Sequence, residues 1–379
     1  MTKKPSYRFV GYTEPWEQKK LGEVAEVNPK SVVPDEFKYV DLGAVIGTEM
    51  ISYRNETIST SPSRAQRLAI KGDVFYQTVR PYQKNNYLFK KDDNDYVFST
   101  GYAQLRPSGD GCFLLSYLQT NKFVNVVLDN CTGTSYPAIN SKDLSDIFIS
   151  LPSLPEQTAI GSFFQDIDQL ISLQQRKLEV LKEQKKTYLK LLFPAKGQTK
   201  PALRFAGFEN EWKEVKLGEV VASERKGKAK SEMIGNKSVY LDTIYLNGGE
   251  QTRVDCDCDT SKEDIIILWD GSQAGAVYYG FEGALGSTLK SYKIFGSGSF
   301  YYQQMKASQS LIFERYRTPN IPHVIKSFLD DFYIFTTSLP EQEAIASFFQ
   351  DLDKTIAKQE EKVSQLKESK QTLLRKMFI

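Results

Sequence analysis

The sequence predicts an α+β protein that contains two mixed α/β globular domains and two long helices paired as an antiparallel coiled coil. Three observations predict this architecture. A motif at residues 153–168 returns almost unchanged at residues 338–353. Each copy then continues as a heptad pattern of apolar residues. The long stretches before the two motifs share an opening but otherwise scarcely resemble each other, so the chain is a pseudo-two-fold internal repeat with two different inserts.

The repeat also sets the expected domain boundaries. We expect globular domains over residues 1–152 and 195–337, and helices over residues 153–194 and 338–379. A chain of 379 residues is long enough for about two to three domains.

Both globular domains open in the same way. Each opening has an Arg-Phe-x-Gly motif, a tryptophan and a Lys-Leu-Gly-Glu-Val motif, which begin at Arg8, Trp16 and Lys20 in the first domain and at Arg204, Trp212 and Lys216 in the second. Runs rich in β-branched and aromatic residues, bounded by turn residues, predict strands. These runs cover residues 39–43, 73–77, 96–99, 239–243, 264–269 and 276–279. A helix is expected over residues 112–128.

The two long helices carry a coiled-coil seam. Alternating steps of four and three residues from Ile160, and from Ile345 in the second copy, visit mainly apolar residues over about four heptads. The polar exceptions occur at matched positions, namely Gln174 with Gln359 and Lys185 with Lys370. Polar seam residues cost stability but specify register, so the two helices are expected to pair with each other or with similar partners.

The helix starts and the connection between the copies support this arrangement. Ser153-Leu-Pro-Glu156 and Ser338-Leu-Pro-Glu341 each offer a capping-box serine and a first-turn proline. A helix of roughly 38 residues is about 57 Å long, whereas the roughly ten residues after Pro194 span at most about 35 Å. Antiparallel pairing needs no long return and is therefore favoured. Ordinary long core helices are the alternative interpretation.

Composition excludes several classes of protein. No run approaches the roughly 18 apolar residues of a membrane span, and no signal peptide is visible, so we expect a cytoplasmic protein with no membrane partner. Only Cys256 and Cys258 lie close together, which is at best half of a zinc site. We expect no metal site, no cofactor and no catalytic residues, because the phosphate-binding and dinucleotide-binding motifs are absent and His323, beside a proline, suits a structural role.

Several loops carry side chains suited to DNA. Arginine and lysine can pair with guanine edges, amides with adenine, and hydroxyls with phosphates. The candidates in the first domain are Arg80, Tyr82, Gln83, Lys84, Ser99, Thr100, Thr134, Ser135 and Tyr136. The candidates in the second domain are Arg225, Lys226, Lys228, Ser272, Gln273, Ser287 and Thr288. Polar surface loops without a ligand have the same composition. The net charge of +2 does not favour DNA binding by itself.

The repeated Ser-Leu-Pro-Glu-Gln helix starts, the Trp-x-x-x-Lys-Leu-Gly-Glu openings and the two unlike inserts resemble the specificity subunit of type I restriction–modification systems. The resemblance covers the whole chain. It implies that each insert is a target-recognition domain reading one half of a bipartite double-stranded DNA target. It also implies that the coiled coil is a spacer that docks two methyltransferase subunits, with restriction subunits joining them. S-adenosylmethionine, ATP and Mg would then be bound by those partner subunits.

Two alternatives of other classes stay open from the residues alone. One is a coiled-coil scaffold that does not bind DNA and presents two protein-interaction domains. The other is an enzyme whose site has no recognised motif. Salt-dependent binding to duplex DNA distinguishes the first interpretation from both alternatives, because phosphate contacts release counterions.

Overall fold

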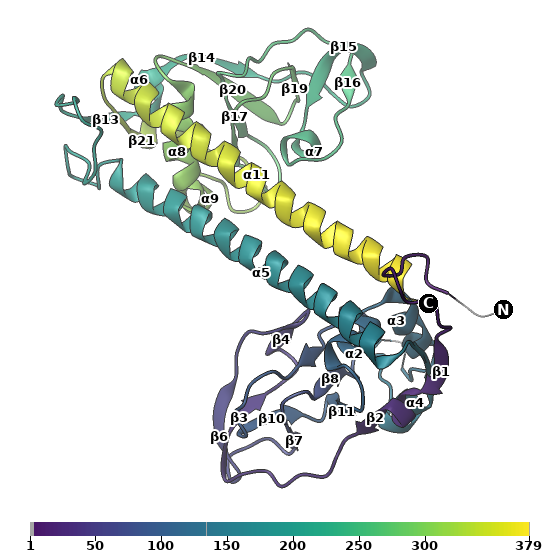
Figure 1. Ribbon diagram of the computed structural model, residues 1–379. Coiled ribbons are helices and arrows are strands. Elements are labelled where there is room, and N and C mark those ends of the chain that lie inside the picture. The colour runs from purple at the N-terminus through teal and green to yellow at the C-terminus, as the bar shows by residue number, and fades with distance from the viewer. Residues whose placement is uncertain (1–3, 134, 379) are drawn as a thin grey trace. The chain divides into compact units, whose positions relative to one another are not determined.

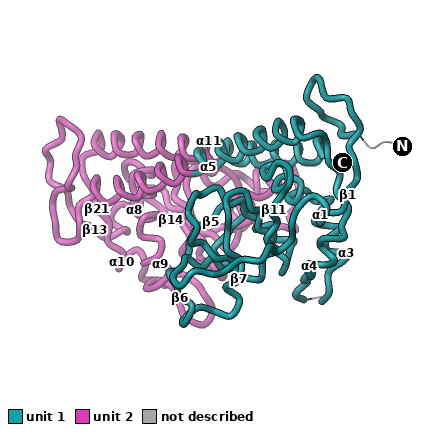
Figure 2. Tube along the Cα trace, turned by 60° about the horizontal axis from the view of Figure 1, so that its bottom comes forward, with its two compact units in different colours: residues 1–175, 361–379 teal, residues 176–360 magenta. Residues whose placement is uncertain are grey.

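The computed structural model describes residues 4–133 and 135–378 and contains two long helices among mixed α/β elements (Figure 1). The chain divides into two compact units: unit 1 is residues 1–175 with 361–379, and unit 2 is residues 176–360 (Figure 2). Each unit therefore combines one globular domain with part of both long helices.

Unit 1 contains two four-stranded sheets. Its strands are β1 (Glu17–Lys20), β2 (Ala25–Val27), β3 (Glu36–Val40), β4 (Val45–Ile46), β5 (Glu49–Met50), β6 (Arg54–Thr57), β7 (Ala65–Leu68), β8 (Val74–Gln77), β9 (Tyr87–Leu88), β10 (Tyr96–Ser99), β11 (Tyr102–Pro107) and β12 (Phe148–Leu151). Its short helices are α1 (Leu21–Val24), the 3-10 turn η1 (Pro81–Gln83), α2 (Gly111–Leu118), α3 (Asn121–Asp129) and α4 (Ser141–Asp146). The sheet orders are β2-β11-β8-β9 and β6-β3-β10-β7, and β1 pairs with β12.

Unit 2 contains a sheet equivalent to the β2-β11-β8-β9 sheet of unit 1. Its strands are β13 (Lys213–Lys216), β14 (Val221–Lys226), β15 (Ile234–Leu241), β16 (Arg253–Val254), β17 (Ile265–Leu268), β18 (Val277–Tyr278), β19 (Ala284–Leu285), β20 (Leu289–Ile294) and β21 (Tyr333–Thr336). Its short helices are α6 (Leu217–Val220), α7 (Thr243–Leu246), α8 (Gly298–Ala307), α9 (Gln309–Arg315) and α10 (Phe328–Asp331). The order β14-β20-β17-β18 matches β2-β11-β8-β9, and the β13–β21 pair matches β1–β12.

The predicted strands over 73–77, 96–99, 239–243, 264–269 and 276–279 are confirmed as β8, β10, β15, β17 and β18, with shifted ends. The run over 39–43 is a strand only in its first two residues, because β3 ends at Val40 and the chain turns at residues 42–43. The single helix expected over residues 112–128 is wrong, because the structure has two helices there. The Thr120 hydroxyl accepts a hydrogen bond from the Phe123 N–H and thereby caps α3, so the chain leaves α2 before α3 begins.

The two long helices are α5 (Leu154–Leu191), with 38 residues, and α11 (Leu339–Met377), with 39. Every expected seam position is buried or half-buried, including Gln174 and Gln359, so the predicted seam is confirmed. Within unit 1, Lys370 late in α11 forms an ion pair with Asp168 early in α5. Within unit 2, Lys185 late in α5 pairs with Asp353 early in α11. The helices are therefore antiparallel, as predicted.

The glutamate in the first turn of each long helix binds an arginine. Glu156 and Glu341 are 1% and 0% exposed, and each accepts a hydrogen bond of 2.7 Å from an arginine Nε, that of Arg8 and Arg204 respectively. A buried carboxylate requires a partner of opposite charge. The repeated Arg-Phe-x-Gly motif supplies that partner and attaches each domain opening to the start of the long helix that follows it.

The C-terminal end of each long helix closes an aromatic core. In unit 1, Phe378 packs against Trp16, Phe113 and Phe164 with ring centroids 5.5–6.2 Å apart. In unit 2, Phe193 occupies the same place, 5.3–6.0 Å from the rings of Trp212, Phe300 and Phe349. Both phenylalanines are buried. Each domain core is thus completed by the helix that ends there.

Candidate nucleic-acid interface

The three candidate loops of unit 1 meet beside the end of β8. The loop over residues 78–86 follows β8, the turn over 99–101 joins β10 to β11, and the segment 132–136 follows α3. Thr78 donates its N–H and its hydroxyl to the Gly101 carbonyl at 2.9 and 2.8 Å. Arg80 donates its N–H to the Pro137 carbonyl at 2.7 Å. Candidates chosen from separate stretches of sequence therefore belong to one surface.

The candidate loops of unit 2 also meet, beside the end of β17. Trp269 donates its N–H to the Thr288 carbonyl at 2.8 Å, and Gly271 donates to the Pro322 carbonyl at 3.0 Å. The basic run, which begins with the last two residues of β14 and continues beyond it, joins them, because Ser287 donates its N–H to the Ala229 carbonyl at 3.0 Å. The basic run and the two polar turns are therefore neighbours.

The two surfaces share one backbone plan. The Arg80–Pro137 and Gly271–Pro322 backbone bonds are equivalent, as are the Thr78–Gly101 and Trp269–Thr288 bonds. A glutamine side-chain amide binds the backbone of each loop. Gln119 donates to the Lys84 carbonyl at 2.9 Å, and Gln309 donates to the Gly275 carbonyl at 2.6 Å. The units therefore present different side chains from equivalent loops.

The candidates of unit 1 differ in exposure. Tyr82, Gln83, Ser135 and Tyr136 are exposed, whereas Arg80, Lys84 and Thr100 are half-buried. Ser99 is 3% exposed, and its hydroxyl accepts a hydrogen bond of 3.2 Å from the Gly101 N–H, so in the free chain this hydroxyl supports the turn. Thr134 lies outside the described residues.

In unit 2, Arg225, Lys226, Lys228, Ser272, Gln273 and Thr288 are exposed and Ser287 is half-buried. Two of the cations are already engaged. Lys226 forms an ion pair with Asp270, and Arg225 donates to the Asp259 carbonyl at 2.8 Å. Within residues 4–133 and 135–378, no carboxylate lies within ion-pair distance of Lys228, which leaves its ammonium for an external anion.

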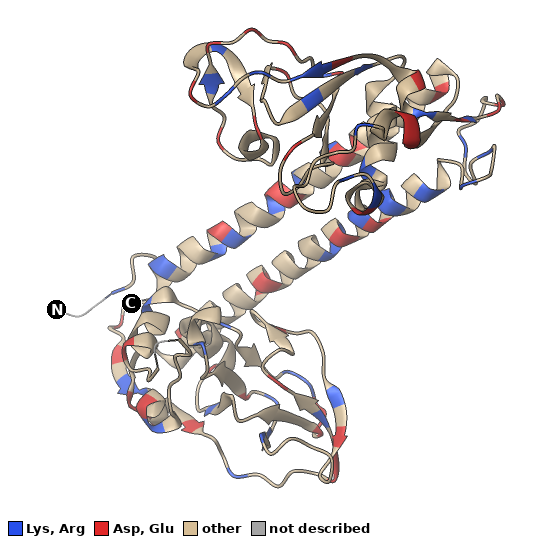
Figure 3. Ribbon diagram, turned by 180° about the vertical axis from the view of Figure 1, so that it is seen from behind, with Lys and Arg blue, Asp and Glu red and all other residues tan. Residues whose placement is uncertain are grey.

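Positive charge is widely compensated by neighbouring carboxylates, and Figure 3 shows the two signs interspersed along α5 and α11. In unit 1, for example, Arg106 pairs with the buried Asp73 at 2.9 Å. Arg80 is different, since its guanidinium lies over the Tyr136 ring, 4.3 Å from the centroid, and no carboxylate of the described residues is within ion-pair distance. The small net charge is therefore compatible with a locally cationic loop.

Residue-type reasoning missed Arg317, which lies beside the unit 2 loop. Its guanidinium donates to the Ser272 carbonyl at 3.3 Å and lies over the Phe313 ring. The segment is positioned by a backbone bridge between Asp270 and His323. Because this contact joins residues far apart in the chain, no local signal in the sequence indicates it. His323 itself contacts the Thr318 hydroxyl at 3.1 Å, which suits a structural role.

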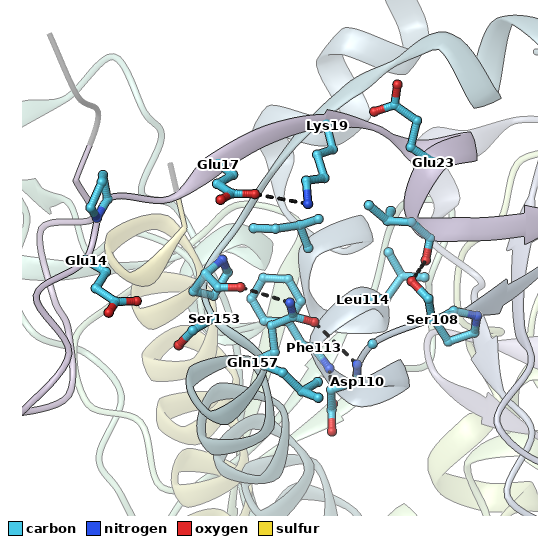
Figure 4. Close-up of a pocket in the computed structure, with 17 residues that line it drawn as sticks. Glu14, Glu17, Lys19, Glu23, Ser108, Asp110, Phe113, Leu114, Ser153 and Gln157 are labelled. Atoms are coloured by element: carbon cyan, nitrogen blue, oxygen red, sulfur yellow. Dashed lines mark hydrogen bonds and ion pairs between the residues drawn. The ribbon is translucent and has the colours of Figure 1, made fainter.

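A surface cavity of about 390 Å³ lies in unit 1 at the start of α5 (Figure 4). Lys19 pairs with Glu17 at 3.0 Å. Asp110 caps α2 through the Phe113 N–H, and the Gln157 amide joins α5 to the Asp110 N–H. Several polar groups at this cavity thus bind one another, and the Gln157–Asp110 bond connects the domain to its helix, as at a structural junction.

The described residues contain no metal-binding cluster and no helix suited to a membrane. Across residues 4–133 and 135–378, no three histidine, cysteine, aspartate or glutamate side chains are grouped so that they could hold a metal ion. The four cysteines are free thiols. None of the described helices combines the length and the apolar character needed to cross a membrane.

Comparison with protein families identifies the repeated part of this chain. The family described as type I restriction modification DNA specificity domain matches this chain twice, over residues 13–183 and 209–368. This chain belongs to that family. The two matched segments begin near the openings of the two globular domains and run into α5 and α11, so the family repeat coincides with the structural repeat.

Two curated relatives are specificity subunits of type I restriction enzymes. The MjaVIII subunit of Methanocaldococcus jannaschii is 28% identical over 180 residues, which cover 44% of this chain and 42% of the relative. The HindI subunit of Haemophilus influenzae is 24% identical over 142 residues, which cover 36% of this chain and 30% of the relative. The matched regions thus span less than half of each relative.

Solved structures share the fold across the whole chain. A type I restriction–modification S subunit from M. genitalium matches with a TM-score of 0.68 and 17% identity, covering 100% of this chain and 99% of that one. A chain from a structural study of the assembly and conformational transition of the type I R-M system matches with a TM-score of 0.56 and 21% identity, covering 98% and 99%. At these identities the likeness concerns the fold alone.

Proposed function

We propose that this type I specificity subunit is non-catalytic and reads a bipartite double-stranded DNA target, with one globular domain for each half-site. One observation carries the proposal. Equivalent loops meet at one end of equivalent sheets in the two units, and they present different side chains. A shared scaffold with different loop residues suits the reading of two different short sequences, because base edges are read by side chains while phosphates position the protein.

We further propose that the paired helices dock two methyltransferase subunits, which restriction subunits join. The internal repeat supports this, because the two copies of the long helix offer equivalent surfaces, which suit two copies of one partner. The partner subunits would bind S-adenosylmethionine, ATP and Mg, while this chain would supply only specificity. A complex that acts on cellular DNA would work in the cytoplasm of a bacterial or archaeal cell.

Binding to duplex DNA tests the first part. The chain would be purified with its methyltransferase subunit, and its affinity for random duplex DNA would be measured at several salt concentrations. Contacts to several phosphates make the logarithm of the affinity fall linearly with the logarithm of the salt concentration, with a slope of about −0.9 per phosphate neutralised. An absence of binding at low salt would reject the proposal in favour of a protein-binding scaffold.

Mapping of methylated adenines tests the bipartite target. Co-expression with the methyltransferase subunit should mark one motif genome-wide, consisting of two short defined sequences separated by an unspecified spacer of fixed length. A single continuous motif, or methylation without sequence preference, would contradict the assignment of one half-site to each domain.

A further inference from the structure

The loop after β8 holds two basic residues in a backbone geometry that suits glycine. Arg80 and Lys84 have φ angles of 54° and 56°. Residues with a Cβ atom rarely adopt this left-handed region, and they are strained when they do. The equivalent positions of unit 2 are both glycine, Gly271 and Gly275, with φ angles of 124° and 94°. Unit 1 therefore keeps two cations at positions where glycine would relieve the strain.

The equivalence of these positions rests on three independent observations. Arg80 and Gly271 each lie three residues beyond the last residue of their strand, and Lys84 and Gly275 each lie seven beyond it. Arg80 and Gly271 each donate the backbone N–H to a proline carbonyl. Lys84 and Gly275 each accept a hydrogen bond from a glutamine side-chain amide at the backbone carbonyl.

Lys84 anchors the loop. Its ammonium donates to the Asn121 side-chain carbonyl at the start of α3, and its own carbonyl accepts from Gln119. Burial, together with the nearby ammonium of Lys370, lowers the pKa of Lys84. These contacts fix Lys84 at one end of the loop. Arg80, at the other end, is the cation left to contact DNA.

The Arg80 guanidinium is presented for recognition. Its central carbon lies over the Tyr136 ring, 4.3 Å from the centroid, which restricts where the guanidinium can move, and Tyr136 is itself exposed. A guanidinium offers N–H groups along its edge that match two adjacent acceptors. Strain together with a stacked cation is typical of a group held in place for binding.

Gln83 adds a second donor at the same tip. The Gln77 amide nitrogen donates to the Val79 carbonyl at 2.7 Å and to the Gln83 side-chain oxygen at 2.8 Å. The carbonyl of Val79 can only accept, which fixes the orientation of the Gln77 amide. The Gln83 oxygen is thereby engaged inside the loop, and the exposed Gln83 offers its NH₂ group outward. Arg80 and Gln83 together present donors.

We propose that Arg80 reads a guanine in the half-site contacted by unit 1, donating to its O6 and N7 atoms in the major groove, with Gln83 donating beside it. Guanine is the base whose major-groove edge places two acceptors next to each other. The inference rests on the proposed binding of duplex DNA by unit 1. A phosphate is the other acceptor-rich group of DNA, and the experiment below distinguishes the two.

The test uses the complex with the methyltransferase subunit and the target found by methylation mapping. Affinity would be measured for that target and for duplexes in which each guanine of one half-site is replaced by adenine or by 7-deazaguanine, which lacks the N7 acceptor. In the unaltered protein, one guanine should contribute about tenfold or more to affinity. Arg80→Ala should abolish that preference, and Arg80→Lys should reduce it, because lysine can pair with guanine but lacks the planar pair of N–H groups. Lys142→Ala, which removes an exposed cation on α4, should preserve it.

Two outcomes would overturn the proposal. If Arg80→Ala weakens binding equally for all duplexes and reduces the salt slope by about one, Arg80 contacts a phosphate. If the variants keep the full preference at every guanine, Arg80 reads no base. A complex that binds no duplex DNA would instead reject the proposed function itself, so the two failures are distinguishable.

A stability measurement tests the strain argument separately. Glycine is ordinarily less stabilising than alanine, but at a left-handed position the order reverses. Arg80→Gly should therefore melt at a higher temperature than Arg80→Ala while losing the guanine preference to the same extent. A lower melting temperature for the glycine variant would show that the loop is not strained at Arg80.

Discussion

Lys185 of α5 donates a hydrogen bond to Asp353 of α11, with 2.6 Å between Nζ and Oδ1. The same pair recurs in unit 1 between Lys370 and Asp168. Both aspartates end the repeated motif, so each seam lysine meets the equivalent residue on the opposite helix. A half-buried lysine requires a partner, and a shifted register would separate the two charges. These pairs give a physical reason for the lysines among the polar seam positions.

Reversing the charges of the unit 1 pair tests this role. Lys370→Asp alone should lower the free energy of unfolding by about 1–2 kcal/mol, because it places two carboxylates together in the seam. Adding Asp168→Lys should restore most of that loss. The free energies would be measured by urea denaturation followed by circular dichroism. Glu183→Gln serves as the control, since Glu183 pairs with Lys186 on the solvent side of α5 and should contribute little.

A double variant no more stable than Lys370→Asp would contradict the pairing. In that case the two residues would act independently, and the register would have to be set by the apolar seam positions or by the glutamines.

The closing phenylalanines provide a test of the two compact units. Phe378→Ala should destabilise unit 1 by about 3–5 kcal/mol, because it leaves a cavity among Trp16, Phe113 and Phe164. Hydrogen exchange measured by mass spectrometry should then show faster exchange in β8 and β11. Phe193→Ala should have the corresponding effect on β17 and β20 of unit 2.

The control for this experiment is Phe148→Ala, which removes the same side chain from an exposed position in β12. It should change exchange very little. If Phe378→Ala instead accelerated exchange equally in all four strands, the units would unfold together and the ends of the helices would not close separate cores.

Much of the fold, namely the long helices and most strands, could be predicted because the sequence patterns that indicate them are local. Heptad spacing and matched polar interruptions are visible within single helices, and the strands follow from short runs of apolar residues. The role of Glu156 could not be predicted, since its partner Arg8 is 148 residues away. The break before α3 was also missed, because the apolar pattern continues across the Thr120 cap.

The candidate interface could be predicted only in part. Residue type selected loops that do meet in each unit, but it did not indicate which cations are already paired. Asp270 engages Lys226 across 44 residues of sequence, and Arg317 reaches its loop through a distant bridge. Likewise, the left-handed geometry at Arg80 is a property of the folded backbone, and no composition or spacing rule marks it.

An exchange of inserts tests whether the domains read independently. Residues 25–147 would be replaced by the corresponding insert of a relative, which leaves β1 and β12 paired in the frame. Mapping of methylated adenines should show a change in one half of the target only. The reciprocal exchange over residues 221–332, which leaves β13 paired with β21, should change the other half. If both halves changed after either exchange, the domains would not be independent readers.

Lengthening both helices tests whether the coiled coil sets the spacer between the half-sites. One heptad would be inserted after Leu181 in α5 and one beside Glu360 in α11, since Lys182 pairs with Glu360 at 2.6 Å and so locates the facing position. Each heptad adds about 10 Å, or roughly three base pairs of duplex. Methylation mapping should show a spacer longer by about that amount, or a loss of methylation because three base pairs rotate the second half-site by more than a quarter turn. A heptad in α5 alone is the control, because it separates Lys185 from Asp353 and should disrupt the pairing. An unchanged target methylated at an unchanged rate by the doubly lengthened protein would show that the helices do not determine the spacing.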